Sequence, residues 1–236
     1  MPGTSPTLTR LTRRAADALR FAALVGPLPL AGCLRGALPA RELYRLRPLP
    51  EVVTIPAGST TSLAAAAEPL TVEPYATPGV YGAPAIVYRV GQTRYGTYPS
   101  REWAVPLGAM LAALTAEQLR QLHGGPGLVR DGHPGARTRG LVWRGPVREF
   151  EEVDEGARVA AAVRLDVQLV RAADDSVLWQ GAAQTRRPVA PPDAMTAVVD
   201  SLSAAAGAAI AELVRGAAPA LRAAPAAVAR AASGAR

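Results

Sequence analysis

The clearest pattern in the chain is an alternation of apolar and polar residues between positions 159 and 169. Apolar residues occupy every odd position, and residues such as Arg164 and Asp166 stand between them. A period of two predicts a β-strand with one buried face. The Asp-Asp-Ser sequence at 174–176 then predicts a turn, and residues 177–185 predict the return strand.

Further strands are predicted on both sides of this hairpin. Residues 42–47 form a first short strand-like piece, and residues 70–75 form a second. The β-branched run at 85–90 and the segment 93–98 flank Gly91-Gln92, which predicts a hairpin. Residues 141–150 are a fifth strand candidate.

Two segments have the spacing of amphipathic helices. The first runs from a Ser100 cap to about residue 122, with Trp103 and Pro106 in its early turns. The second follows Pro191-Pro192-Asp193, where the carboxylate can accept backbone N–H bonds. Its apolar face continues to residue 213, and Gly216 is its expected C-terminal stop.

Together these elements predict an α+β fold. We expect one sheet, mainly antiparallel, with both amphipathic helices packed on one face. The alternation at 159–169 fits a sheet with only one covered face.

The N-terminal segment combines a basic stretch, an apolar run and a small-residue site before a cysteine. Four arginines precede the apolar residues 21–30, and Leu30-Ala31-Gly32-Cys33 follows as a lipobox. This is the layout of a secretory signal peptide. Cleavage before Cys33, which is the sole cysteine, would leave an N-terminus whose thiol is diacylated.

This segment divides the chain into four parts. We expect a lipoprotein signal peptide at 1–32, a lipidated tether at 33–40, a folded domain at 41–216 and a low-complexity Ala/Pro/Arg tail at 217–236, disordered or loosely helical. Leu34 follows the cysteine where retention in the inner membrane usually requires Asp. The expected location is therefore the periplasmic face of the outer membrane.

Charge adds little to this picture. The chain carries a formal net charge of +7, and removal of residues 1–32 takes away four arginines and one aspartate, which leaves +4. Every basic residue is Arg, and the arginines are scattered rather than clustered on one helix. Nucleic acid is therefore not an expected partner, whereas a weak attraction to anionic lipid headgroups stays open.

Catalytic signatures are missing from the sequence. His123 and His133 are the two histidines, both in Gly/Pro-rich segments without zinc-binding spacing. There is no Gly-x-Ser-x-Gly elbow, and Gly124-Gly125-Pro126-Gly127 lacks the lysine of a phosphate-binding loop. We expect no catalytic residue, no metal and no cofactor.

Two groups of residues allow a functional and a structural interpretation. The acidic run Glu149–Glu155 could supply acid–base or calcium chemistry, but Glu155-Gly156 predicts a turn, and solvated turn charges are the favoured interpretation. Trp103, Trp143 and Trp179 could line a lipid groove, although core packing is the more frequent role of aromatic residues in such elements.

Longer stretches resemble a known family. Residues 75–89, with the core Ile86-Val87-Tyr88-Arg89, and residues 93–107, with Trp103-Ala104-Val105-Pro106-Leu107, resemble the ABC-type transport auxiliary lipoprotein family. A Tyr-x-Leu strand after the lipobox matches at Tyr44-Arg45-Leu46. The C-terminal half is similar as well, so the resemblance covers about residues 30–215.

That resemblance implies a function. The family, which includes the paraquat-inducible protein C type, is thought to serve intermembrane lipid transport as a partner of ABC transporters that use MCE-domain proteins. It implies an accessory anchored in the outer membrane, with Cys33 as its one functional position and a homo-oligomer, such as a ring, as a further expectation. Two alternatives remain: an envelope-assembly chaperone of an outer-membrane protein, and an envelope enzyme.

Overall fold

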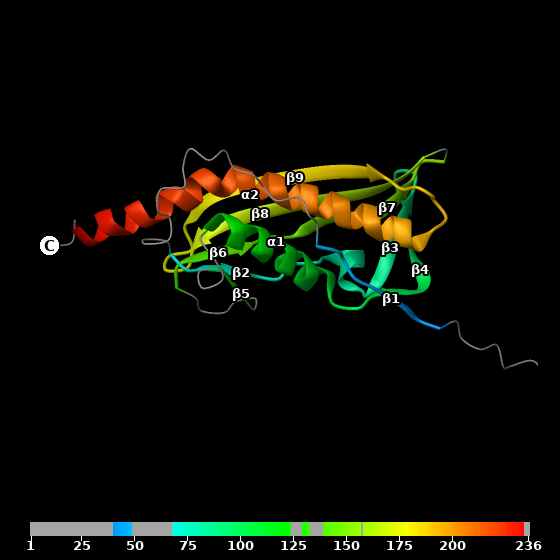
Figure 1. Cartoon of the computed structure of the whole chain (residues 1–236), viewed down its shortest axis with the longest axis horizontal. Coiled ribbons are helices and arrows are strands. Elements are labelled where there is room, and N and C mark those ends of the chain that lie inside the picture. The colour runs from blue at the N-terminus through cyan, green and yellow to red at the C-terminus, as the bar shows by residue number, and fades with distance from the viewer. Residues whose placement is uncertain (1–39, 49–67, 124–128, 133–138, 157, 234–236) are drawn as a thin grey trace, which may run out of the picture. The chain divides into compact units, whose positions relative to one another are not determined.

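A computed structural model describes residues 40–48, 68–123, 129–132, 139–156 and 158–233. Within them the chain forms an α+β fold with a nine-stranded mixed sheet and two α-helices (Figure 1). The strands are β1 (Glu42–Tyr44), β2 (Leu70–Val72), β3 (Ala85–Val90), β4 (Arg94–Trp103), β5 (Val129–Asp131), β6 (Leu141–Arg144), β7 (Val147–Asp154), β8 (Val159–Arg171) and β9 (Val177–Pro188). The helices are α1 (Leu107–His123) and α2 (Met195–Ser233), and a 3-10 turn, η3, spans Gly79–Gly82.

The long strand β8 organises the sheet. It pairs with β9 along one edge, and along the other edge it pairs first with β7 and then with β6. From β7 the sheet continues through β3 and β4 to β1, and from β6 it continues through β2 to β5. Among the described strands, four pairings are antiparallel and four are parallel.

The expectation of an α+β fold is therefore confirmed, but that of a mainly antiparallel sheet is wrong. The parallel pairings join segments that are far apart in the chain, such as β1 with the end of β4 and β2 with both β5 and β6. A local pattern reveals a hairpin because its two strands are neighbours in sequence. It carries no information about a three-residue strand whose partner lies about 60 residues away.

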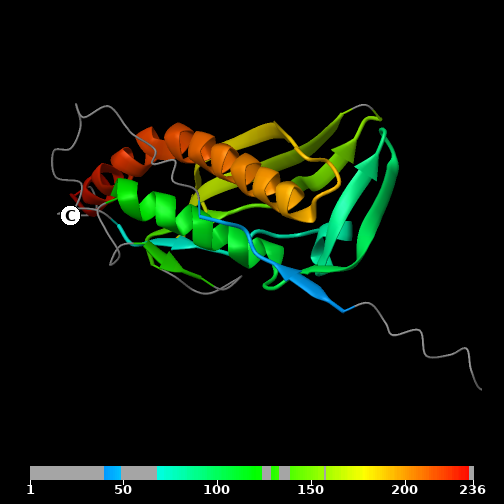
Figure 2. The same ribbon diagram turned by 45° about the vertical axis from the view of Figure 1, so that its right-hand side comes forward.

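Both helices lie side by side in front of the strands in Figures 1 and 2. α1 contacts β2 and β5, α2 contacts β8 and β9, and the two helices contact each other. The apolar stripes of both helices bury their large residues completely or nearly so: Leu107, Leu111, Leu119, Leu202, Ile210 and Leu213. This buried layer between helices and sheet is the core that orients the remaining surfaces.

The first helix begins later than predicted. Ser100 lies inside β4 with a φ of 58°, and the chain stays extended to Trp103 because β3 and β1 both pair with this end of β4. Pro106 instead precedes the helix, and its carbonyl accepts hydrogen bonds from the amides of Ala109 and Met110. Proline suits this place, since its missing N–H would have no partner there.

The second helix ends later than predicted. α2 continues through Gly216 to Ser233, and Ala217, Ala218 and Leu221 are buried. The part of α2 at Met195–Ala224 is long and apolar enough to cross a membrane. However, 67% of its most apolar stretch is buried inside the domain. α2 is therefore the core helix of the domain, and its extension covers the Trp179 end of β9.

A single predicted strand at 141–150 is two strands, β6 and β7. They are separated at Gly145-Pro146, where a Cβ on Gly145 would lie 1.9 Å from the carbonyl oxygen of Asp166. The backbone of β8 thus passes so close that only glycine fits. The neighbouring Pro146 carbonyl accepts a hydrogen bond from the Asp166 amide, at 3.2 Å, so β8 bridges the break.

Candidate functional site

The position expected to carry function, Cys33, lies outside the described residues. So do His133 and the Gly124–Gly127 segment, whereas His123 is the last residue of α1. In the described part of the chain, no three His, Cys, Asp or Glu side chains gather in a way that could hold a metal ion. The structure brings together other polar groups, most of them on β7, β8 and β9.

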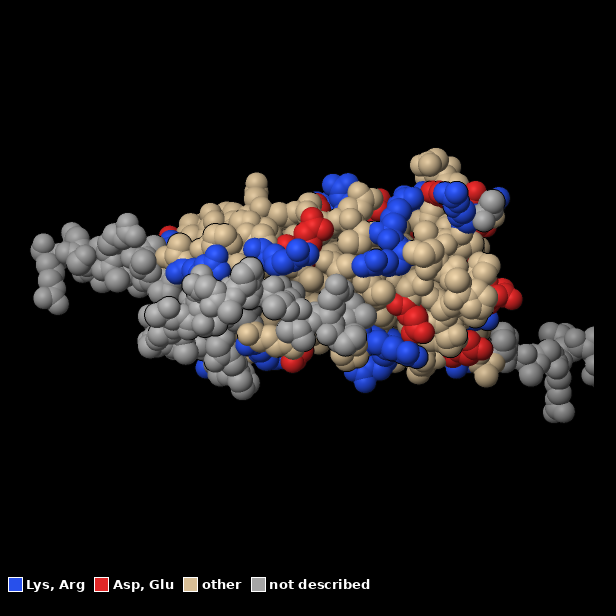
Figure 3. Space-filling model, turned by 45° about the horizontal axis from the view of Figure 1, so that its top comes forward, with Lys and Arg blue, Asp and Glu red and all other residues tan. Residues whose placement is uncertain are grey.

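A polar network covers the side of β8 that faces away from the helices. Leu165, Val167 and Leu169 are buried, so the residues between them point to the opposite face. There Arg148 donates to Asp166 at 2.7 Å, Gln184 donates to Glu149 at 2.9 Å, and Arg186 donates to Glu155 at 3.0 Å. On the helix side and upper edge of the molecule, which Figure 3 shows, basic and acidic side chains are also interspersed rather than separated by sign.

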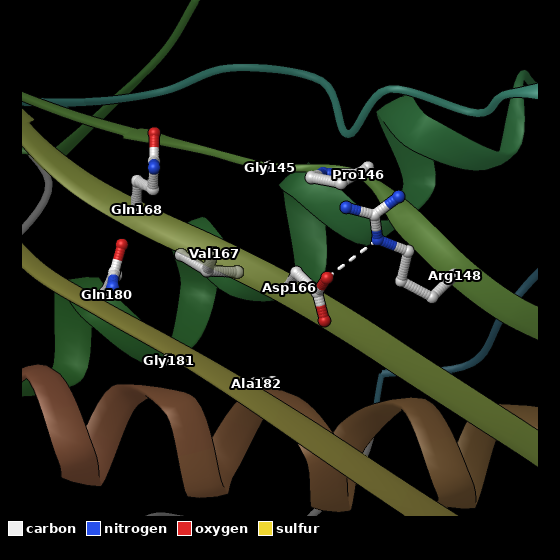
Figure 4. Close-up of a pocket in the computed structure, with 9 residues that line it drawn as sticks. All are labelled: Gly145, Pro146, Arg148, Asp166, Val167, Gln168, Gln180, Gly181 and Ala182. Atoms are coloured by element: carbon white, nitrogen blue, oxygen red, sulfur yellow. Dashed lines mark hydrogen bonds and ion pairs between the residues drawn. The ribbon is translucent and has the colours of Figure 1, made fainter.

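A hollow of about 510 Å³ opens in this face at the break between β6 and β7. Figure 4 shows the Asp166 and Arg148 side chains pointing toward each other, with Gln168 farther along β8 and Gln180 beside it on β9. Asp166 Oδ1 is buried without a hydrogen-bond donor, and Arg164 Nε lies 3.7 Å from it. The residues that line the hollow supply side-chain amides and a carboxylate paired with an arginine, and these groups can hydrogen-bond to polar groups. The lining residues do not include a nucleophile with a neighbouring base.

A buried ion pair fixes η3 to the sheet. Arg89 Nε donates to Glu151 Oε1 at 2.7 Å, and the Tyr81 hydroxyl donates to Glu151 Oε2. Arg89 also donates to the Gly91 carbonyl at 2.7 Å. Burial and the hydrogen bond to the Glu151 carboxylate raise the pKa of Tyr81, and the same carboxylate raises the pKa of Arg89. Tyr81 and Arg89 therefore hold their protons more tightly than free side chains do, and the cluster ties η3 to β3 and β7.

The acidic run is not a set of solvated turn charges, so that interpretation is wrong for most of it. Residues 149–154 lie on β7, and Glu151 and Glu152 are buried. The Tyr98 hydroxyl donates to Glu152 at 2.8 Å, and burial raises the pKa of this carboxyl. The apolar residues Phe150 and Val153 within the run are the sequence signal that could have indicated a strand.

Comparison with known proteins identifies the domain. A family model described as ABC-type transport auxiliary lipoprotein component matches residues 53–214. The chain belongs to this family. A search of the curated proteins finds no match.

Solved structures agree with the fold of an ABC-type transport auxiliary lipoprotein. A crystal structure of a Xanthomonas campestris protein is similar with a TM-score of 0.57 and 19% identity, covering 76% of this chain and 96% of that one. An uncharacterized protein is similar with a TM-score of 0.56 and 16% identity, covering 75% and 97%. At these identities the likeness establishes the fold alone.

The tryptophans of this auxiliary lipoprotein belong to its core. Trp103 packs edge-on against Phe150 with ring centroids 5.8 Å apart, and Trp143 stacks on Trp179 at 5.9 Å. Trp103 and Trp143 are buried, and the half-buried Trp179 packs against the same core. Their aromatic faces are used inside the domain, which confirms the structural interpretation over the lipid groove.

Proposed function

We propose that this protein is a lipid-anchored periplasmic accessory of an MCE-type ABC system for intermembrane lipid transport. The observation that carries this proposal is the family match over residues 53–214. The lipobox at 30–33 supports it independently, because it lies N-terminal to the domain that the family model covers. The part played by the protein is mechanical and noncatalytic.

Anchoring depends on Cys33. Cleavage after Gly32 and acylation of the new N-terminus place two or more acyl chains at the start of the tether at 33–40, followed by the domain from 41 onward. Several chains anchor a protein far more firmly than a single one. With Leu34 as the next residue, the destination is the periplasmic face of the outer membrane.

The edge of β9 is a suitable contact for a transporter subunit. Among the described strands β9 pairs with β8 alone, over most of its 12 residues. Its central sequence, Gln180-Gly181-Ala182-Ala183-Gln184, is uncharged and small at 181–183, so no charge opposes an added strand. An extended segment of an MCE-domain protein, or of a second copy in a homo-oligomer, can extend the sheet here by backbone hydrogen bonds.

Mild-detergent affinity purification from envelope membranes tests the proposal. Co-purification of MCE-domain and ABC subunits supports it. Recovery of an outer-membrane β-barrel instead supports the alternative, an envelope-assembly chaperone. An Ala182→Lys variant adds charge to the exposed edge and should lose the subunits that bind there, whereas Ala113→Lys, the same change at an exposed position on α1, should not.

A further inference from the structure

In the first described segment after the tether, exposed and inward-facing residues alternate from Leu43 to Arg47. Glu42, between Arg41 and Leu43, is also exposed, and its carboxylate lies 3.3 Å from Arg101 on β4. Arg41, Leu43, Arg45 and Arg47, which we name the basic strip, are all exposed. Tyr44 and Leu46 between them pack against or into the core. In extended backbone, alternate side chains point to opposite sides, so the strip forms one outward side of residues 41–47.

The outermost charges of the strip are positive. Arg41 lies 3.5 Å from Glu102, but its side chain is 75% exposed and that of Glu102 only 22%. Arg47 lies 3.2 Å from Asp200, with 70% and 47% exposed. The carboxylates therefore sit deeper than the guanidinium groups, and such exposed pairs exchange partners easily. Arg45 has no ion pair with any described residue.

Leu43 gives the strip an apolar member. Its side chain is 62% exposed on β1, which pairs with β4 alone in the described sheet. A leucine between arginines is the combination that suits a bilayer interface, where guanidinium groups contact phosphates and an apolar side chain enters the acyl boundary.

Chain length places the strip close to the anchor. Arg41 follows Cys33 by eight residues, which span at most about 29 Å when fully extended. A lipidated Cys33 therefore holds the strip within reach of the membrane surface, where anionic headgroups attract basic side chains near a lipid anchor.

We propose that the basic strip lies on the surface of a bilayer containing anionic phospholipids and turns this side of the domain toward the membrane. The proposal rests on the acylation of Cys33 proposed above. The acyl chains hold the protein at the membrane, and the strip fixes which side faces it. The edge of β9 is thereby left for other contacts.

A fluorescent label at position 43 tests this orientation. The mature lipoprotein is reconstituted into vesicles of phosphatidylcholine, alone or mixed with phosphatidylglycerol. Because an acylated Cys33 has no free thiol, Leu43→Cys accepts an environment-sensitive dye at a single site. We expect a blue shift and a fall of about twofold or more in quenching by acrylamide with the anionic vesicles only, reversed by high salt.

Matched variants isolate the strip. Val177→Cys labels an apolar residue of similar exposure, 50%, at the start of β9, and its emission should not change with lipid composition. Combining Arg41→Gln, Arg45→Gln and Arg47→Gln should abolish the shift at position 43. The same three changes at the exposed residues Arg158, Arg164 and Arg187 should leave it intact.

Two results would overturn the proposal in distinguishable ways. If the protein floats with both kinds of vesicle but the dye at position 43 is quenched equally in both, the strip does not contact lipid, although the anchor holds. If the protein does not float and Cys33 reacts with the dye, the anchor fails, and the orientation that depends on it fails too. Protection of position 43 only after a protein partner is added also overturns it.

Discussion

At the residue scale, the most consequential side chains are the buried ion pair of Arg89 and Glu151. Both are almost completely buried, and each finds a second partner, Gly91 for the arginine and Tyr81 for the glutamate. A buried pair of this kind gains little over apolar residues, but loss of one member leaves an uncompensated charge in the interior.

Removal of the Glu151 carboxylate should therefore destabilise the domain strongly. We expect Glu151→Ala to lower the free energy of unfolding by about 3–5 kcal/mol, measured by chemical denaturation of the purified protein. Glu155→Ala removes the carboxylate of an exposed pair with Arg186 and should cost less than about 1 kcal/mol. Equal losses in the two variants would contradict the role given to the buried pair.

Glu152 should make stability depend on pH in the opposite direction from an ordinary ion-paired carboxylate. Burial raises its pKa in the folded state above the value of the unfolded chain, 4.5. The folded protein then holds the proton more tightly, so stability falls as pH rises through the window between the two pKa values. Glu152→Gln, whose carbonyl can still accept from Tyr98, should raise the free energy of unfolding at pH 7 but not at pH 4.

Denaturant titrations of wild type and Glu152→Gln at the two pH values measure this difference. If Glu152→Gln lowers the free energy of unfolding by the same amount at pH 7 and at pH 4, the charged carboxylate of Glu152 does not destabilise the folded protein.

At the element scale, α2 determines how much of the chain belongs to the folded domain. It passes Trp179 at Gly216, where an added Cβ would lie 3.0 Å from the indole ring. Beyond that point Ala217, Ala218 and Leu221 remain buried. The extension of the helix past Gly216 is therefore held by packing against the domain, since its Ala- and Pro-rich sequence alone does not indicate it.

Truncation of a side chain in this extension distinguishes a packed helix from a loose tail. Leu221→Ala should cost about 2–5 kcal/mol of unfolding free energy because it leaves a cavity. The adjacent Arg222→Ala, at an exposed position, should stay within about 0.5 kcal/mol of wild type. If neither substitution changes the free energy of unfolding measured in urea, Leu221 is not part of the structure that unfolds cooperatively with the domain.

These elements show which parts of the structure could be predicted from the sequence. The hairpins β3–β4 and β8–β9 were predictable because their strands are adjacent and strongly patterned. β5 was missed because its sequence, Val129-Arg130-Asp131, has one apolar residue followed by two charged ones. The burial of Glu151 was missed because its partner Arg89 lies 62 positions away, and a local run of acidic residues looks like solvated charge.

At the scale of the whole molecule, a mixed-sheet domain follows the proposed lipid anchor in the chain. The family match covers residues 53–214 and leaves Cys33 outside it. The two contact surfaces proposed for the domain are the β9 edge and the basic strip. Location then decides which partners the domain can meet.

Loss of the acylated thiol should release the protein from the envelope membranes. We expect Cys33→Ser to move the protein out of the outer-membrane fraction, with at least about a tenfold drop in the share that floats with lipid. Fractionation on a density gradient with immunodetection measures this share. A Ser59→Ala variant, which changes a hydroxyl far from the lipobox in sequence, should fractionate as wild type does.

The most direct test of the central claim is the mass of the N-terminus of the mature protein purified from membranes. The account predicts a chain that begins at Cys33, with residues 1–32 removed and fatty acids added to that residue. An intact leader with an unmodified Cys33 thiol would contradict the anchor, the location and the proposed partnership together.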